Sequence, residues 1–408
     1  MEFALTEEQT MLQASVRRFV DKAYTFAARG ESLREHGGFD RRHWTTMAGM
    51  GWLGVALDDD VGGSGGSAIE QAIVLEELGR GLVVEPVLAV AVLAAHAIAR
   101  GASARQRQAW LPLLAEGAQR FVLAHGEPEA RGRIAWVQTR ASPTRGGWSL
   151  RGQKTLVLGG PCADRFIVSA RVAGQAGDEA GIELFCVDPA APGMRRRDYR
   201  LIDDRLASDL VIDDVVVDRD ARLAGENGAF VALDRAYGEA IIGACAEAVG
   251  TMECALWLTR DYLTTRKQFG VSIGSFQTLQ HRMADLVVAL EQARAMVHRG
   301  LAFLDHPDPS QRRCAVAATK AQVGWSGKFI GAQGIQLHGG IGMSDECSIG
   351  HYFKRLAAFD VSFGGAHDHL ATLALGYGSH AVLGEESRDE SSTATGSPVA
   401  SFAARATT

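Results

Sequence analysis

The most informative stretch of the sequence is Arg266-Lys-Gln-Phe-Gly270, which is followed by Phe276-Gln-Thr-Leu-Gln-His-Arg-Met-Ala-Asp-Leu286. It lies among three long segments in which apolar side chains recur at helical spacing, residues 230–266, 276–303 and 310–337. Each of these segments is long enough for a bundle helix. We therefore expect a C-terminal helical bundle over residues 226–383.

Two other patterns precede the bundle. Residues 1–120 have helical spacing, with Thr6 and Gln9 placed as a capping box ahead of an apolar run. Residues 121–225 hold short β-rich runs separated by Gly, Pro and Asp, which is typical of antiparallel strands. We predict an α+β fold, with an N-terminal helical domain, a middle antiparallel β-barrel or sandwich domain and the C-terminal bundle. Residues 384–408 are rich in Ser, Thr, Ala and Glu, and we expect a disordered tail.

The composition excludes several classes of function. The 408 residues carry a formal net charge of -6, without the basic excess that nucleic-acid binding needs. Six cysteines occur without a CxxC pair, so neither a disulfide frame nor a metal site is expected. The longest apolar candidate, residues 83–98, contains Glu85, Pro86 and His96, which argues against a membrane span. We expect a cytoplasmic protein.

Two motifs have chemistry suited to a phosphate-bearing ligand. Arg266 is expected at a helix end before a Gly-bearing turn, where its guanidinium can meet a diphosphate in a bidentate manner. The alternative is an ordinary surface arginine. Gln336 with Gly339 and Gly340 offers an amide donor and a close backbone approach to a phosphate or adenosine. The alternative for these residues is a helix C-cap followed by a turn, and both interpretations can hold together.

These stretches, with Gln336-Leu-His-Gly-Gly-Ile-Gly-Met343 and Gly152-Gln-Lys-Thr-Leu-Val-Leu-Gly-Gly160, have the order and separations of one family. From about residue 3 to about residue 382 the chain resembles the acyl-CoA dehydrogenases. The resemblance implies a C-terminal four-helix bundle, FAD as the cofactor and an acyl-CoA substrate. The implied reaction removes the α-proton of the thioester while the β-hydride passes to flavin N5, giving a trans-2-enoyl-CoA.

The resemblance also implies two sets of flavin contacts. The residues that match the family's contacts to FAD held mainly by the neighbouring subunit are Arg266, Phe269, Gln277, Gln336, Gly339 and Gly340. In the middle domain the matching stretches bring Gly126, Leu156 and Leu158 to the isoalloxazine. Relatives commonly carry hydroxyl side chains where Gly126 and Leu158 stand. The backbone N–H groups that bind the pyrimidine ring are retained here.

The family's usual catalytic glutamate is replaced by Gly364, which offers only its backbone N–H to the thioester carbonyl. Some branches place the base on the preceding long helix, where this sequence has Ala240. Glu247, in an apolar stretch, is then either a salt-bridged residue or the base. Glu239, which is adjacent to Ala240, is a second candidate for the base. His367 and Asp368, just after Gly364, are further candidates for the base, though each is more simply a residue of the bundle.

The pattern around residues 353–365 resembles branches that act on bulky or dicarboxylic acyl-CoAs, such as pimeloyl-CoA and sterol side-chain CoA dehydrogenases. The resemblance implies a homotetramer or an α2β2 heterotetramer, with electron-transferring flavoprotein as a partner. Two alternatives remain: a non-catalytic subunit that completes a neighbour's flavin site, and a flavoprotein whose chemistry needs no base. Many relatives carry an Asp and an Arg for CoA at the start of the helix that corresponds to residues 238–241, and this sequence has neither there. Arg235 and Arg133 are therefore candidate CoA contacts.

Overall fold

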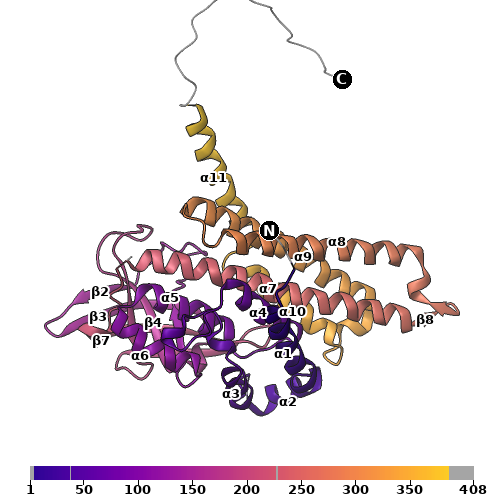
Figure 1. The fold of residues 1–408 in the computed structure, drawn as a ribbon, viewed down its shortest axis with the longest axis horizontal. Coiled ribbons are helices and arrows are strands. Elements are labelled where there is room, and N and C mark those ends of the chain that lie inside the picture. Colours follow the sequence, from indigo (N-terminus) through magenta and orange to yellow (C-terminus); the bar gives the residue numbers. More distant parts are fainter. Residues whose placement is uncertain (1–3, 37, 227, 386–408) are drawn as a thin grey trace, which may run out of the picture.

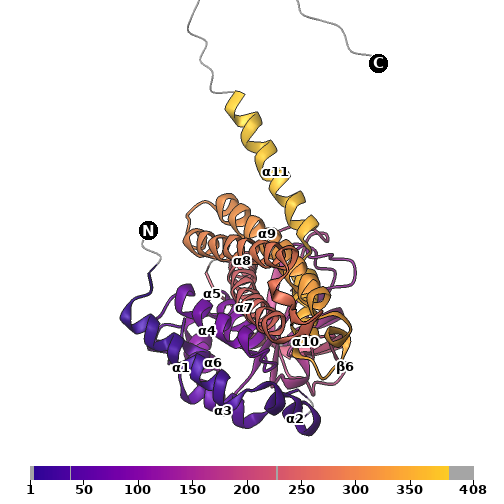
Figure 2. The same cartoon turned by 90° about the vertical axis from the view of Figure 1, so that its right-hand side faces the viewer.

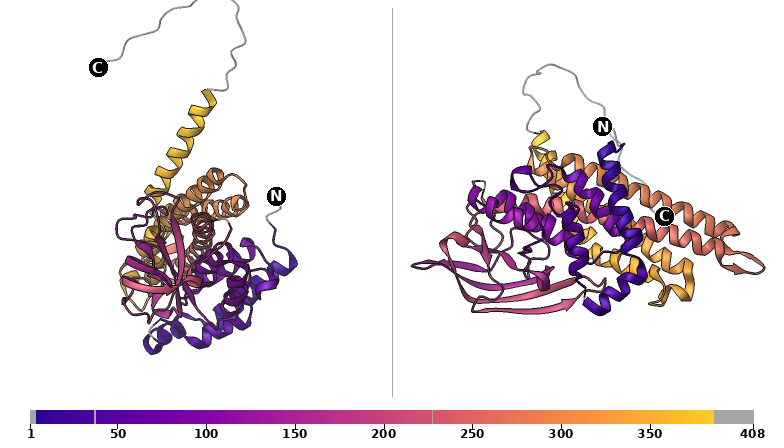
Figure 3. Two further views of the ribbon diagram at one scale, coloured as in Figure 1. Left: turned by 90° about the vertical axis from the view of Figure 1, so that its left-hand side faces the viewer. Right: turned by 60° about the horizontal axis from the view of Figure 1, so that its bottom comes forward.

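The computed structural model describes residues 4–36, 38–226 and 228–385. The first part of the chain is helical, as expected, and its helices pack beside the long helices of the bundle (Figure 3). The capping box is confirmed, because Thr6 and Gln9 exchange both of its hydrogen bonds. The elements are α1 (Glu7–Ala23), α2 (Phe26–His36), α3 (Arg41–Gly49), α4 (Ala68–Arg80), the π-helical η3 (Leu88–Ala94), α5 (Ala95–Gly101) and α6 (Ala104–Ala115).

A seven-stranded sheet follows, in the order β1-β4-β2-β3-β7-β6, with β5 paired to β4. Its strands are β1 (Phe121–Ala124), β2 (Arg140–Pro143), β3 (Gly147–Leu158), β4 (Arg165–Arg171), β5 (Ile182–Val187), β6 (Met194–Arg200) and β7 (Leu206–Asp218). The long β3–β7 pair and most other pairs are antiparallel. Antiparallel pairing therefore predominates, as predicted, although β1 pairs with β4 in parallel and β2 meets β4 in parallel at Arg140.

The bundle is built around α7 (Ala229–Thr265), which packs against α4, α8 (Gln277–Phe303), α9 (Pro309–His338) and α10 (Ser348–Val361). The sheet lies at one end of the molecule and the short β8 (Lys267–Gln268) and β9 (Val271–Ser272) hairpin at the other (Figure 1). α11 (Ala366–Glu385) begins on α9 and then projects outward (Figure 2). The helix therefore extends two residues into the expected tail, and residues 386–408 lie outside the described residues.

The longest apolar helix is α7 rather than residues 83–98. It is long and apolar enough to cross a membrane by length and composition, and 72% of its most apolar window is buried inside the protein. Glycines allow the close contact between α7 and α4. A Cβ on Gly250 would lie 1.8 Å from the carbonyl oxygen of Glu76, and a Cβ on Gly79 would lie 2.1 Å from that of Glu247. This helix is thus a core element around which both helical parts are packed.

Candidate active site

Gly364 lines a cavity of about 670 Å³, which we call the Gly364 cavity. Its walls come from the middle-domain loop 131–136, from α7, from α9 and from the start of α11. The apolar part of the wall includes Ile241, Val316, Ala317 and Leu375. Five arginines also line the cavity, namely Arg131, Arg133, Arg235, Arg312 and Arg313. A cavity with an apolar wall and several cationic groups suits a ligand with an apolar part and an anionic part.

The turn that carries Gly364 has left-handed backbone angles, with φ of 59° at Phe363 and 92° at Gly364. The buried ammonium group of Lys320, on α9, donates hydrogen bonds to the carbonyl oxygens of Asp360 and Gly364, each at 3.1 Å. Burial lowers the pKa of Lys320. In the part of the chain that the structure describes, no hydrogen bond uses the N–H of Gly364. The carbonyl of this residue is therefore held in place while its N–H stays available to a ligand.

Three polar side chains lie beside this turn in the Gly364 cavity. Nε2 of His369 lies 2.9 Å from the carbonyl oxygen of Phe363, and Asp368 accepts a hydrogen bond from the N–H of Gly365 at 2.9 Å. The ring of Tyr237 lies edge-on to that of Phe363, and burial raises the pKa of its hydroxyl. Of these three, Asp368 was predicted as a candidate base, together with His367. The cavity is lined by His369 instead of His367.

Glu247 does not line the Gly364 cavity. Its Oε1 lies 2.5 Å from Nη1 of Arg355, and Arg205 is 3.7 Å away. Both arginines also bind Asp203, Arg355 at 2.9 Å and Arg205 at 2.6 Å. The structure thus supports the salt-bridge alternative for Glu247 rather than the role of a base.

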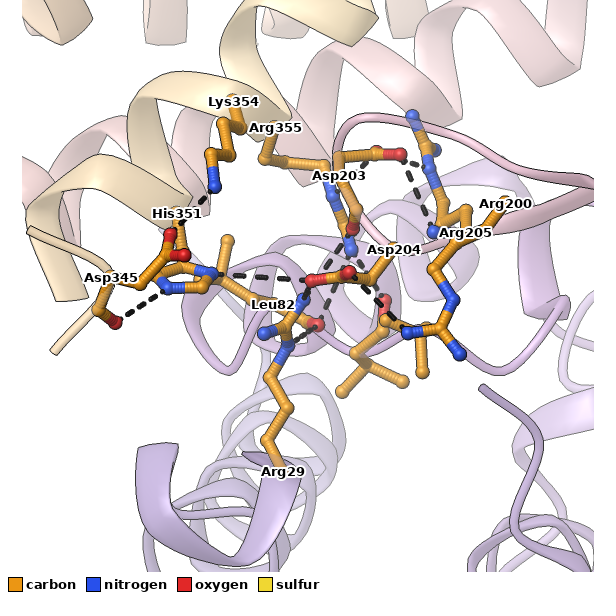
Figure 4. A network of polar contacts seen from close by, with 12 residues as sticks. Arg29, Leu82, Arg200, Asp203, Asp204, Arg205, Asp345, His351, Lys354 and Arg355 are labelled. Carbon is orange, nitrogen blue, oxygen red and sulfur yellow. Dashed lines mark hydrogen bonds and ion pairs between the residues drawn. The ribbon is translucent and has the colours of Figure 1, made fainter. Parts of the chain in front are cut away.

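This ion network joins the three parts of the fold (Figure 4). Arg355 comes from α10 of the bundle, and Asp203 comes from the turn between β6 and β7. Arg29 of α2 binds the adjacent Asp204 at 2.9 Å and donates to the carbonyl of Leu82 at 3.0 Å. Arg355 reaches the same carbonyl at 3.3 Å. Glu247 belongs to a structural junction of the domains.

Glu239 faces a second cavity of about 370 Å³ that does not include Gly364. Its carboxylate pairs with Arg100 and lies 2.8 Å from Nδ1 of His96. Burial alone would raise the pKa of Glu239, but His96 and Arg100 together lower it. A carboxylate held in its charged form by two partners, on another face of α7, is poorly placed as a base for the Gly364 cavity.

The middle-domain flavin stretches are adjacent in space. The N–H of Thr155 donates to the carbonyl of Gly126 at 2.8 Å, and a Cβ on Gly126 would lie 3.0 Å from the carbonyl oxygen of Thr155. Leu156 has a φ of 50° and an exposed side chain, and its N–H donates to Asp209 at 3.2 Å. Leu158 lines a small cavity of about 40 Å³. The structure therefore brings Gly126 and Leu156 together. The N–H of Leu156, one of the backbone donors expected to bind the flavin, is already bound to Asp209.

A buried polar cluster, not anticipated from the sequence, supports these stretches. The ammonium group of Lys154 lies 2.8 Å from the carboxylate of Glu127 and 2.9 Å from the hydroxyl of Ser169. His125 contacts the same hydroxyl at 2.9 Å. Burial lowers the pKa of Lys154 to about 8 and, together with Lys154, lowers that of His125 to about 3. Because polar groups this deeply buried require partners, the cluster fixes the backbone on either side of Gly126.

The second predicted set is gathered at the far end of the bundle. One cavity of about 680 Å³ is lined by Arg266, Gln336, Gly339 and Gly340, and also by Arg282 of α8, a cation not predicted from the sequence. A Cβ on Gly339 or Gly340 would meet no atom within 4 Å, so this turn is open. Phe269 is 91% exposed at the tip of the hairpin, and Gln277 is exposed at the start of α8. Two arginines beside an open glycine turn fit the diphosphate of a dinucleotide.

Comparison with known proteins identifies the family. Models of the acyl-CoA dehydrogenase N-terminal, middle and C-terminal domains match residues 6–118, 123–215 and 228–374. Benzylmalonyl-CoA dehydrogenase of Aromatoleum aromaticum is 31% identical over 78% of this chain and 84% of its own length. The caffeyl-CoA reductase-Etf complex subunit CarC of Acetobacterium woodii is 25% identical over 87% and 94%. The ChsE4-ChsE5 complex of Mycobacterium tuberculosis matches with a TM-score of 0.83 and 27% identity, over 93% of this chain and 99% of that one.

The chain belongs to the acyl-CoA dehydrogenase family, and the predicted three-part fold is confirmed. It is an oxidoreductase of the FAD-dependent type. The residues present fit this cofactor, because the Arg266 cavity and the Gly126–Leu156 stretches supply the two expected contact regions. When bound, FAD supplies an acceptor for the β-hydride of an acyl thioester. Heteromeric complexes and complexes with electron-transferring flavoprotein occur among the relatives.

Proposed function

We propose that this chain dehydrogenates an acyl-CoA whose acyl group is bulky or dicarboxylic. The observation that carries the proposal is the Gly364 cavity itself, which brings together an apolar wall and the free N–H of Gly364. Neither Gly364 nor Gly365 fills that space with a side chain. The N–H is a suitable donor to a thioester carbonyl, whose oxygen gains negative charge as the α-proton leaves.

The arginines of the cavity support CoA as the carrier. Arg235 donates to the carbonyl of Leu304 at 2.5 Å, and Arg312 donates to that of His306 at 2.7 Å, so both guanidinium groups gather at one loop. Coulombic repulsion from Arg235 adds to burial in lowering the pKa of Arg312, as expected for two cations held close together. A pair of this kind would be relieved by the phosphates of CoA. Arg133 stacks on Trp136 at the same cavity.

The test is anaerobic titration of the FAD-loaded protein with a series of acyl-CoAs. Loss of flavin absorbance, together with the formation of an enoyl-CoA in mass spectra, is expected to favour branched, cyclic or dicarboxylic acyl groups over short linear ones. Absence of bleaching with every acyl-CoA would contradict the proposal. Electron-transferring flavoprotein is the proposed acceptor, and its reduction is measured in the same assay.

A second candidate is a non-catalytic subunit of a heteromeric acyl-CoA dehydrogenase. It is favoured by Gly364, which carries no carboxylate, and by the exposed Phe269 beside the open Arg266 cavity, which suit contact with a neighbour's flavin. In this case the protein purified alone is inactive, and activity appears on addition of a partner chain. An Arg266→Ala substitution in this chain would then reduce the flavin content of the partner.

A further inference from the structure

The space that a side chain at position 364 would enter is bounded by His369. A Cβ on Gly364 would lie 3.3 Å from Nε2 and 3.7 Å from Cδ2 of that ring. The other neighbour is Cβ of Asp368, at 3.6 Å. The imidazole of His369 therefore lies beside the position from which the family's catalytic carboxylate extends, and it also lines the Gly364 cavity.

The hydrogen bond of His369 defines its tautomer. Nε2 lies 2.9 Å from the carbonyl oxygen of Phe363, which can only accept a hydrogen bond, so the proton is on Nε2. Nδ1 then carries the lone pair. No described residue forms a hydrogen bond with Nδ1. The ring is thus held through Nε2, on the edge nearest to Gly364, and Nδ1 keeps its lone pair.

The charges around the ring favour its neutral form. Burial is the largest cause that lowers the pKa of His369, and Lys320 of α9 adds to it. The hydrogen bond to Phe363 and then the charge of Asp368 act in the opposite direction without reversing the shift, and the carboxylate of Asp368 accepts a hydrogen bond from the N–H of Gly365. The other titratable groups near the turn are Tyr237 of α7, whose pKa is raised by burial, and Asp360 of α10. At neutral pH the imidazole is therefore a base in its reactive state.

We propose that Nδ1 of His369 accepts the α-proton of the acyl thioester. The α C–H bond breaks, the proton moves to Nδ1, and the electron pair is delocalised onto the thioester oxygen. In dehydrogenation this pair forms the α,β double bond as the β-hydride leaves to FAD with two electrons. Asp368 is a weaker candidate, because its carboxylate is exposed and already bound to the backbone. The inference rests on the proposed function.

The test measures proton removal without oxidation. 3,3-Dimethylbutanoyl-CoA has α-hydrogens but no β-hydrogen, so it can exchange its α-protons in D₂O and cannot be dehydrogenated. The FAD-loaded wild-type protein is expected to catalyse this exchange, followed by mass spectrometry. Because the pKa of His369 is lowered, the rate is expected to hold at the ordinary histidine pKa of about 6.5 and to fall only at lower pH. His369→Gln is expected to slow exchange by about 10²-fold or more, which is the usual contribution of a general base.

Three matched variants serve as controls. His367→Gln changes an exposed neighbour that does not line the Gly364 cavity. Glu247→Gln and Glu239→Gln remove the two carboxylates that lie elsewhere. All three are expected to keep exchange within a few-fold of wild type when the folded protein is compared at equal FAD content.

The outcomes separate the two proposals. Binding of the analogue is measured by calorimetry; if wild type binds no acyl-CoA, the proposed function fails. If wild type binds the analogue but does not exchange it, or if His369→Gln exchanges as fast as wild type, the role of His369 is overturned. If the variant does not fold, the wild-type pH profile decides alone, since a rate that rises through a single ionisation above about pH 6.5 contradicts a histidine base whose pKa is lowered.

Discussion

The ammonium group of Lys320 lies 3.1 Å from the carbonyl oxygen of Gly364 and holds the turn on which the reactive part of the cavity depends. Lys320→Met removes this donor but also removes a buried charge. Because these effects offset each other, the free energy of unfolding is expected to change by no more than about 2 kcal/mol. Turnover and α-proton exchange are expected to fall about tenfold, since misplacing a reacting group by a fraction of an ångström is costly.

Lys328 provides the control for that substitution. It lies on the same helix and its ammonium group is 3.8 Å from the carboxylate of Asp360, but its side chain is exposed. Lys328→Met is expected to leave activity unchanged. Equal losses in both variants would show that the lysine acts through helix stability and not through the turn.

Glu247→Gln is expected to destabilise the protein more than it affects the chemistry. The substitution weakens the buried pair with Arg355, whose remaining acidic partner is Asp203, and we expect a loss of about 2–3 kcal/mol in the free energy of unfolding. Glu253→Gln, in partly exposed pairs with Arg80 and Arg294, should cost less than about 1 kcal/mol. Urea unfolding measures both. A stable Glu247→Gln protein without exchange activity would restore Glu247 as the base.

The buried His125 is expected to make the free energy of unfolding sensitive to acid. With its pKa at about 3 in the folded protein, His125 stays neutral where the unfolded chain takes up a proton near pH 6.5. Stability is therefore complete above pH 6.5 and falls towards pH 3, by at most about 1.4 kcal/mol for each pH unit. His125→Gln should flatten the dependence of the unfolding free energy between pH 6.5 and pH 5, while the exposed His281→Gln should not. Parallel curves for wild type and His125→Gln would contradict the assignment.

The two arginines of the Arg266 cavity are expected to contribute to the affinity for FAD. Arg266→Ala and Arg282→Ala each remove one charged donor. Each substitution is expected to cost about 1.5–3 kcal/mol of FAD binding free energy, which raises the dissociation constant about 10- to 100-fold. Flavin fluorescence on dilution measures the constant. Arg260→Ala is the control, because that side chain binds Asp261 and does not line the cavity. Unchanged affinity in the Arg282 variant would assign the phosphates to Arg266 alone.

Features encoded by neighbouring residues in the sequence were predicted correctly more often than features assembled from residues far apart in the sequence. The helices α7, α8 and α9 follow directly from apolar spacing, and the Arg266, Gln336, Gly339 and Gly340 set was found because each motif is local. The edge strand β6 gives no such signal, because its sequence Met-Arg-Arg-Arg-Asp-Tyr-Arg has no apolar alternation.

The residues around Gly364 could not be placed from the sequence, because they converge from separate elements. Lys320 precedes Gly364 by 44 positions, and Glu247 meets Arg355 across 108 positions. A lysine within the apolar stretch of α9 was the one local signal that a buried polar contact existed. On α7, the seven-residue spacing places Glu247 within about 20° of the face of Ala240, whereas Glu239 is turned by about 100°. The arginine partners of both glutamates appear only in the folded chain.

Restoring the family's carboxylate tests whether Gly364 is merely a lost base. Gly364 has a φ of 92°, and a side chain there would begin 3.3 Å from the imidazole of His369. Gly364→Glu is therefore expected to lower the free energy of unfolding by about 1–3 kcal/mol and to displace His369, so that exchange of the thioester α-proton slows. Gly364→Ala has the same backbone cost without the carboxylate, so the difference between the two variants isolates the acid group. Faster exchange in Gly364→Glu than in wild type would mean that the turn accepts a carboxylate, and that the glycine serves only to enlarge the acyl cavity.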